Sequence, residues 1–169
     1  MSLTKSEAMA EILKSGKDPA YFINHYAKIS EPMKGLIPFE LYPFQEDALK
    51  IFNNHRFSVI LKARQLGIST TVAGYICWLM LFQREKNVLI VATKLHTAAN
   101  LVKKVKSIHR HLPSWLKIAE ISINNRTSFE LSNGSQVKAS ATSGDAGRSE
   151  ALSLLVIDEA AFVEGIDEL

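Results

Sequence analysis

The sequence predicts a three-layer α/β domain with a mainly parallel sheet, preceded by a helical N-terminal extension. Two apolar runs, Phe57–Ala63 and Asn87–Thr93, have the length and composition of buried strands, and a long helical pattern follows each of them. A third apolar run, Leu152–Ile157, ends in two acidic residues. Strands that alternate with helices favour a parallel sheet covered by helices. The 169 residues are enough for one such domain with a sizeable core.

Residues 1–40 predict the helical extension. The first helical pattern covers Leu3–Lys14. A second helix is expected to follow, because Asp18 is a favourable N-cap and Pro19 suits the first helical position. Residues 30–38 are rich in proline and glycine and predict a loop.

Residues 41–169 predict the α/β core. Its first helix, over residues 43–54, is amphipathic. The apolar face predicted for this helix consists of Phe44, Ala48, Ile51 and Phe52. Residues 69–84 have almost no polar face, as expected for a helix covered on several sides, whereas residues 94–112 form an amphipathic and basic pattern. Residues 118–140 alternate between polar and apolar around two turn signals, which predicts two or three short antiparallel strands.

Composition and charge restrict the class of protein. The net charge of +3 is compatible with a polyanionic partner but does not require one. Cys77 is the one cysteine, so an intrachain disulfide is impossible, and its apolar surroundings predict a small buried side chain. The N-terminus lacks the apolar core of a signal peptide, and the longest apolar run, Thr71–Phe82, is too short to span a bilayer. A cytosolic protein with no membrane partner is expected.

Residues 62–69 have the position of a phosphate-binding loop between a predicted strand and a predicted helix. The backbone N–H groups of such a loop converge on phosphate oxygens, helped by the positive end of the helix dipole. Ser69 stands where the motif places the hydroxyl that binds Mg²⁺, and Thr70 is a less favoured substitute. The motif G-x-x-x-x-G-K-[ST] has a lysine before that hydroxyl, but here the position is Ile68. An ordinary strand–turn–helix corner is the alternative interpretation.

Two cations precede the loop and could replace the missing lysine. Lys62 occupies the first position of the motif, and its four-carbon stem could reach the same phosphates from the other end of the loop. Arg64 lies inside the loop. The nucleotide contacts predicted for the chain are Gln45, Lys62, Ala63, Arg64, Gln65, Leu66, Gly67, Ile68, Ser69 and Thr70.

The two acidic residues after the last apolar run match a Walker B motif. Asp158 would bind the metal ion at the carboxyl end of a parallel strand, where α/β sheets bind their ligands. Glu159 would polarise the attacking water. Acids that follow a strand are also common as helix caps. The two motifs, in this order and on two predicted buried strands, favour a nucleotide site that holds ATP with Mg²⁺.

Further candidate residues lie outside these two motifs. The amide of Gln45, in the stretch YPFQ, offers the donor and acceptor that suit the N6 and N7 edge of adenine, although it could also be a solvated residue at a helix start. Arg148 is either a solvated loop charge or an arginine finger. The cations of the basic helix are interpreted as a solvated face rather than a DNA contact. They are Lys103, Lys104, Lys106, Arg110 and His111.

The combination of DPAYFINHYAKI…KGLIPFELYPFQEDAL, VILKARQLGIST, VLIVATK and LLVIDEAAF resembles the N-terminal ATPase domain of the large terminase subunit of tailed phages. The resemblance extends from about Asp18 to Phe162. It implies a P-loop NTPase of the additional-strand type and a deviant Walker A loop whose functional lysine stands at its start, here Lys62. Arg64 matches an arginine of that loop, which contacts phosphate or senses its loss.

The resemblance also implies roles for the other candidate residues. Gln45 would bind adenine, Asp158 would hold Mg²⁺ and Glu159 would be the catalytic base. Arg148 corresponds to a finger that acts on a neighbouring subunit. Large terminases continue after Walker B into a coupling motif and a nuclease domain. The resemblance therefore implies a core truncated after the Walker B strand, without the nuclease and without a central strand, so that two sheet edges are left exposed.

The implied function is ATP hydrolysis that translocates double-stranded DNA into a viral prohead. The implied partners are DNA, the portal protein, the small terminase subunit and further copies of the chain in a ring, and the implied location is the host cytoplasm. Two alternatives stay open from the residues themselves. One is a helicase-like, nucleic-acid-dependent ATPase, and the other is a truncated nucleotide-binding module without turnover.

Overall fold

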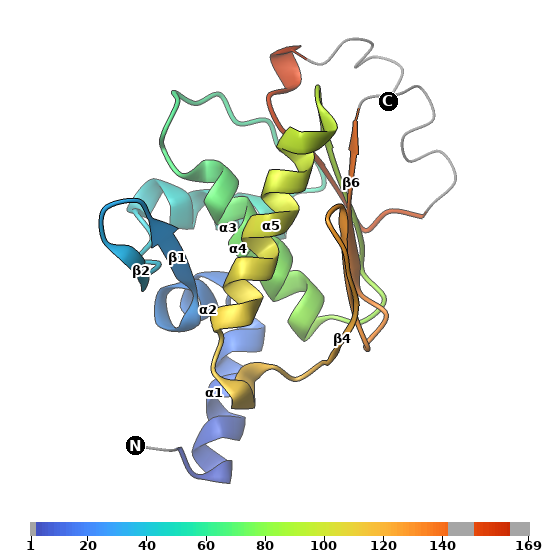
Figure 1. The fold of residues 1–169 in the computed structure, drawn as a ribbon. Helices are drawn as coiled ribbons and strands as arrows, with labels where there is room; N and C mark the ends of the chain where they lie inside the picture. The colour runs from blue at the N-terminus through green and yellow to red at the C-terminus, as the bar shows by residue number, and fades with distance from the viewer. Residues whose placement is uncertain (1–2, 142–150, 163–169) are drawn as a thin grey trace.

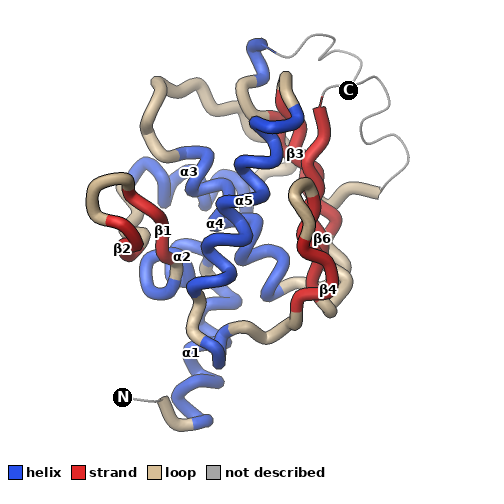
Figure 2. Tube along the Cα trace, in the orientation of Figure 1, coloured by secondary structure: helices blue, strands red, loops and turns tan. Residues whose placement is uncertain are grey.

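The computed structural model describes residues 3–141 and 151–162 (Figures 1 and 2). Its elements are, in chain order, α1 (Lys5–Lys17), α2 (Pro19–Tyr26), β1 (Lys28–Glu31), β2 (Gly35–Pro38), α3 (Pro43–Asn54), α4 (Ile68–Phe82), β3 (Asn87–Ala92), α5 (Leu95–His111), the 3-10 turn η1 (Ser114–Leu116), β4 (Ile121–Asn124), β5 (Ser128–Leu131), β6 (Gln136–Ala141), β7 (Leu154–Ile157) and the 3-10 turn η2 (Ala160–Phe162). The predicted loop that carries Arg148 lies outside the described residues.

The N-terminal helices begin where their capping residues predict. The Asp18 carboxylate accepts a hydrogen bond from the Ala20 N–H at 2.8 Å, and Pro19 is the first residue of α2. Residues 28–38, however, form the antiparallel hairpin β1–β2, part of which was predicted to be a loop. Gly35 allows the turn with a φ of 72°, and the Glu31 carboxylate accepts the Met33 N–H at 3.0 Å. This pairing depends on backbone hydrogen bonds that composition does not reveal.

α3 forms over the predicted residues, and its predicted face is buried only in part: Ala48 is buried and Phe52 packs partly buried against the core. Its buried residues are Gln45, Ala48 and Leu49, whereas Phe44 and Ile51 are each 43% exposed. The predicted face counted apolar residues only. Gln45 is buried because its amide finds hydrogen-bond partners inside the protein, as described below.

The core lies between α4, α5 and the sheet, as the apolar patterns predict. α4 is buried along most of its length, and Cys77 is 1% exposed, which raises the pKa of its thiol. α5 packs against α4 and against β3 and β6. Val88 and Ile90 of β3 belong to the same core. No helix of the described residues is long and apolar enough to cross a membrane.

The sheet is mixed, with a parallel part around β3 and an antiparallel part around β5. Its strand order is β4-β5-β6-β3-β7, in which β3 pairs in parallel with both β6 and β7, and β5 pairs antiparallel with both β4 and β6. Figure 1 shows the sheet nearly edge-on, with the described α-helices on one side of it. Within the described ranges, the helices therefore lie on one side of the sheet and not on both sides, as the predicted three-layer arrangement requires.

The prediction of a buried strand over Phe57–Ala63 is wrong. No strand forms there, and the side chains of Val59 and Leu61 are 99% and 100% exposed. An extended segment needs a neighbouring strand to satisfy its backbone groups, and the described sheet ends at β7 without adding this segment. β7 itself was predicted to be buried, but as an edge strand it leaves Leu155 40% exposed.

Candidate nucleotide-binding site

The start of α4 gathers backbone N–H groups at one point. Gly67 caps the helix with a left-handed φ of 73°, and its carbonyl accepts the N–H groups of Thr70 and Thr71 at 2.9 and 3.0 Å. The N–H groups of Ile68 and Ser69 come before this first bonded turn, so they have no acceptor within the helix. Together with the positive end of the helix dipole, they favour an anion such as phosphate.

Gln45 holds the loop that leads into α4. Its Nε2 donates to the Leu66 carbonyl at 3.0 Å, and its Oε1 accepts the Tyr42 N–H at 3.0 Å. The residue is 2% exposed, so both bonds are shielded from water. The bonds give Gln45 a positioning role that the sequence did not indicate, and its contact with adenine stays a prediction.

Ser69 and Asp158 meet although 89 residues separate them. The Ser69 hydroxyl donates to Oδ2 of Asp158 at 3.4 Å. The other carboxylate oxygen, Oδ1, accepts the N–H of Glu159 at 3.1 Å. The N–H of Asp158 donates to the Val91 carbonyl at 3.0 Å, which continues the pairing of β7 with β3. The sheet thus holds the carboxylate against the start of α4.

The hydroxyl of Ser69 and the carboxylate of Asp158 fit a magnesium ion. Both are hard oxygen donors, and adjacent ligands in an octahedral Mg²⁺ shell lie roughly 3 Å apart, close to the 3.4 Å between these two atoms. Within the described residues, no group of three or more His, Cys, Asp or Glu side chains could hold a metal ion. Such a two-ligand site suits Mg²⁺, which keeps several waters and binds phosphate oxygens.

Glu159 lies at a turn directly after this carboxylate. Its backbone has a left-handed φ of 56°, and its carbonyl accepts the Phe162 N–H at 2.9 Å as η2 begins. The residue is exposed, so its side chain can meet solvent beside Asp158.

The predicted cations of the loop are less well fixed by contacts than Ser69 and Asp158. Lys62, Ala63 and Arg64 belong to the exposed segment 57–67, in which Gln65 has a left-handed φ of 64°. The charge of Lys62 contributes to lowering the pKa of Lys104. Arg148 lies outside the described residues.

Lys104 belongs to the site, although the sequence predicts it to be part of a solvated face. Its Nζ donates to the Thr70 hydroxyl at 3.0 Å. Partial burial of the amine lowers the pKa of Lys104, the charge of Asp158 raises it and the charge of Lys62 lowers it. The residue as a whole remains exposed. No sequence signal distinguishes Lys104 from its neighbour Lys103.

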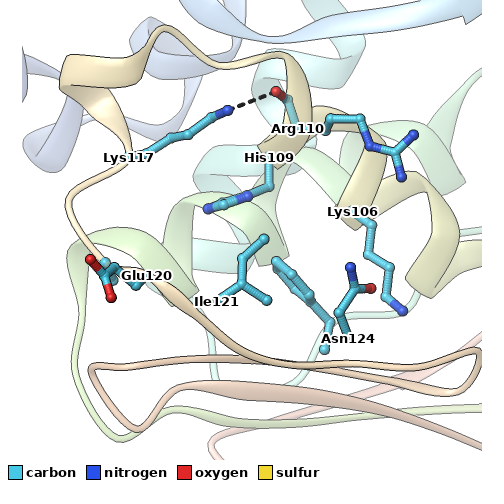
Figure 3. A pocket seen from close by; sticks show the side chains of 9 residues that line it. Lys106, His109, Arg110, Lys117, Glu120, Ile121 and Asn124 are labelled. Carbon is cyan, nitrogen blue, oxygen red and sulfur yellow. Dashed lines mark hydrogen bonds between the residues drawn. The ribbon is translucent and has the colours of Figure 1, made fainter.

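A separate hollow of about 340 Å³ lies at the C-terminal end of α5 (Figure 3). Its lining residues are Lys106, His109, Arg110, Lys117, Ala119, Glu120, Ile121, Asn124 and Phe129. Lys117 donates to the Arg110 carbonyl at 2.8 Å across its rim. None of the residues predicted to bind nucleotide lines it, so the hollow is not part of the candidate site.

Acid is expected to destabilise the protein through His109. The residue is 3% exposed and its Nε2 has no hydrogen-bond partner among the described residues, so burial, with a smaller contribution from the charge of Lys117, lowers the pKa of His109 to about 4. The unfolded chain takes up this proton near pH 6.5. The contribution of neutral His109 to stability is therefore complete above pH 6.5 and is lost as the pH falls towards 4.

Melting temperatures measured between pH 7 and pH 4.5 test this expectation. His109→Phe should lose less stability over that range than the parent, because phenylalanine does not take up a proton. His96→Phe, which changes an exposed histidine of the same helix, should follow the parent. If both variants follow the parent, His109 is not responsible for the acid sensitivity.

The fold and the site define an α/β domain in which a helix start, a hydroxyl and a carboxylate meet beside the end of a parallel strand. No family model matches the sequence. Among solved structures, the chain is similar to the crystal structure of the HK97 bacteriophage large terminase, with a TM-score of 0.62 and 16% sequence identity. The match covers 84% of this chain and 37% of that protein, so the chain spans little more than a third of its length. The resemblance to large terminases is thereby confirmed for the fold.

Proposed function

We propose that the chain is the ATPase domain of a viral DNA-packaging motor and that it hydrolyses Mg-ATP to move double-stranded DNA into a prohead. The main support is the contact between Ser69 and Asp158, because these two motif residues come from distant segments and meet at a helix start. The fold that the chain shares with a phage large terminase agrees with this proposal. The proposed architecture is a P-loop NTPase of the additional-strand type.

Each residue of the site has a proposed role. The backbone N–H groups of residues 65–69 would cradle the phosphates and Lys62 would neutralise their charge. Ser69 and Asp158 would hold Mg²⁺, which neutralises charge that develops on the phosphate oxygens. Glu159 would orient the water for in-line attack. Gln45 is proposed to bind adenine, Arg64 to contact phosphate and Arg148 to act as an arginine finger.

The proposal also covers the assembly and the partners of the motor. The working motor would be a ring of copies of the chain, with the portal protein and the small terminase subunit as partners in the host cytoplasm. A nucleotide-binding module without turnover is a second candidate, favoured by the exposure of residues 57–63, which leaves one side of the loop without support from the sheet. A helicase-like ATPase would instead be recognised by stimulation of a monomer by DNA or RNA.

Calorimetric binding of Mg-ATP tests the proposed function. The parent should bind, and Lys62→Ala should weaken binding by about 10- to 100-fold, because a charge-assisted hydrogen bond contributes about 1.5–3 kcal/mol. Adding Ile68→Lys to that variant should restore binding by returning the lysine to its usual place. Ile68 is 7% exposed, so the melting temperature of each variant must first show that the protein still folds.

Lys28→Ala is a matched control, because Lys28 is exposed on β1. It should bind Mg-ATP as the parent does. A folded parent that does not bind Mg-ATP would contradict the proposed function. If the parent binds and Lys62→Ala binds equally well, the site remains but its predicted lysine is the wrong one.

A further inference from the structure

Lys104 lies beside the two residues proposed to hold Mg²⁺. Its Nζ is 3.0 Å from the Thr70 hydroxyl oxygen, and Thr70 follows Ser69 in the first turn of α4. The Ser69 hydroxyl in turn lies 3.4 Å from the Asp158 carboxylate. α5 packs along α4, and this packing brings the ammonium group to the start of α4 from a residue 34 positions later in the chain.

The loop itself places no cation where the motif has its lysine. Ile68 occupies that position with a buried apolar side chain, and Lys62 lies on an exposed segment with no strand to hold it. Lys104, by contrast, is held on a 17-residue helix within the influence of the Asp158 and Lys62 charges. It is therefore the cation that the described structure places most firmly beside the start of α4.

The hydrogen bond to Thr70 leaves the ammonium group free to take a better acceptor. A neutral hydroxyl is a weaker acceptor for Lys104 than an ionised phosphate oxygen would be. The lysine stem is also flexible enough to move by the length of one hydrogen bond while α5 stays in place. An anion bound at the start of α4 would thus compete with Thr70 for the same ammonium group.

We propose that Lys104 binds the terminal phosphate of a nucleoside triphosphate and so adds, beside Lys62, to the positive charge that the loop lacks at Ile68. The inference rests on the proposed nucleotide site and adds a residue from another helix to it. It makes Lys104 the residue that distinguishes a triphosphate from a diphosphate. Phosphate binding would replace the hydrogen bond from Lys104 to the Thr70 hydroxyl.

Binding of Mg-ATP and Mg-ADP to the full chain, measured by calorimetry, tests this inference. Lys104→Ala should weaken Mg-ATP by about tenfold or more and change Mg-ADP by no more than about twofold, because only ATP carries the phosphate that Lys104 contacts. Lys104→Arg should keep most of the ATP affinity, because it keeps the charge. Lys103→Ala removes the adjacent exposed lysine of α5 and should leave both affinities unchanged.

The outcomes separate this inference from the proposed function. If the parent binds both nucleotides and Lys104→Ala binds them equally well, the role of Lys104 is refuted and the nucleotide site stands. Equal losses for ATP and ADP, or equal effects of Lys104→Ala and Lys103→Ala, also refute it, because they indicate a general effect on the fold or the surface charge. A folded parent that binds neither nucleotide overturns both.

Discussion

Glu159→Gln is expected to lower the turnover of Mg-ATP by about 10²–10⁴-fold, the usual contribution of a general base. Glutamine keeps the size of the side chain but cannot accept the proton of the attacking water. The binding of Mg-ATP should stay close to that of the parent, because the proposed metal ligands are Ser69 and Asp158. Phosphate release under single-turnover conditions, measured beside calorimetric binding, checks both expectations.

Glutamine is chosen so that the substitution does not change the conformational cost of the backbone at position 159. Glu159 has a φ of 56°, and glutamine adopts this left-handed conformation at about the same cost as glutamate. Glu120→Gln is a suitable control, because Glu120 is an exposed glutamate at the hollow by α5, outside the candidate site. If Glu159→Gln hydrolyses ATP at the parent rate, the assignment of the base is wrong even if the nucleotide binds.

Gly67→Ala is expected to destabilise the protein by roughly 2–4 kcal/mol and to weaken Mg-ATP binding. Alanine in the left-handed conformation of this position costs about 1–2 kcal/mol, and its φ of 73° requires that conformation. A Cβ here would also lie 2.7 Å from Nε2 of Gln45, which is buried and bonded to the Leu66 carbonyl. Moving the amide away would lose that hydrogen bond, at about a further 1–2 kcal/mol.

Gly35→Ala is the matched control for the backbone effect. Gly35 has nearly the same φ, 72°, but no atom lies within 4 Å of the Cβ that alanine would add. Chemical denaturation should therefore show the strain alone in Gly35→Ala and a larger loss in Gly67→Ala. Equal losses would mean that Gln45 moves aside without cost, in which case Gln45 does not hold the loop.

Local chemistry accounts for most of the helices and for the inner strand β3. Asp18 and Pro19 predict the start of α2, and the apolar run of β3 predicts a buried strand, because capping and periodicity act within a few residues. Phe57–Ala63 has the same apolar character as β3 and yet forms no strand. The two segments differ in the strands available to pair with them. β3 pairs on both sides, whereas residues 57–63 have no partner in the described sheet.

The candidate site was predictable in part. The two motifs and their order predicted Ser69, Asp158 and Glu159 as site residues. Their residue types match phosphate and metal chemistry. The burial of Gln45 and the direction of its amide could not be predicted, because they depend on the loop that Gln45 contacts. The sequence also placed Gln45 outside the buried face of α3, since that face was inferred from apolar residues alone.

The sequence by itself determined the α/β class, the central helices and the motif residues, because periodicity, capping and loop chemistry depend on neighbours along the chain. Only the tertiary structure decided that the helices lie on one side of a mixed sheet, that residues 57–63 stay outside it, and that Lys104 rather than Lys103 meets Thr70. Adjacent helical residues point about 100° apart. The packing of α5 against α4 therefore turns one lysine towards the site and its neighbour towards solvent.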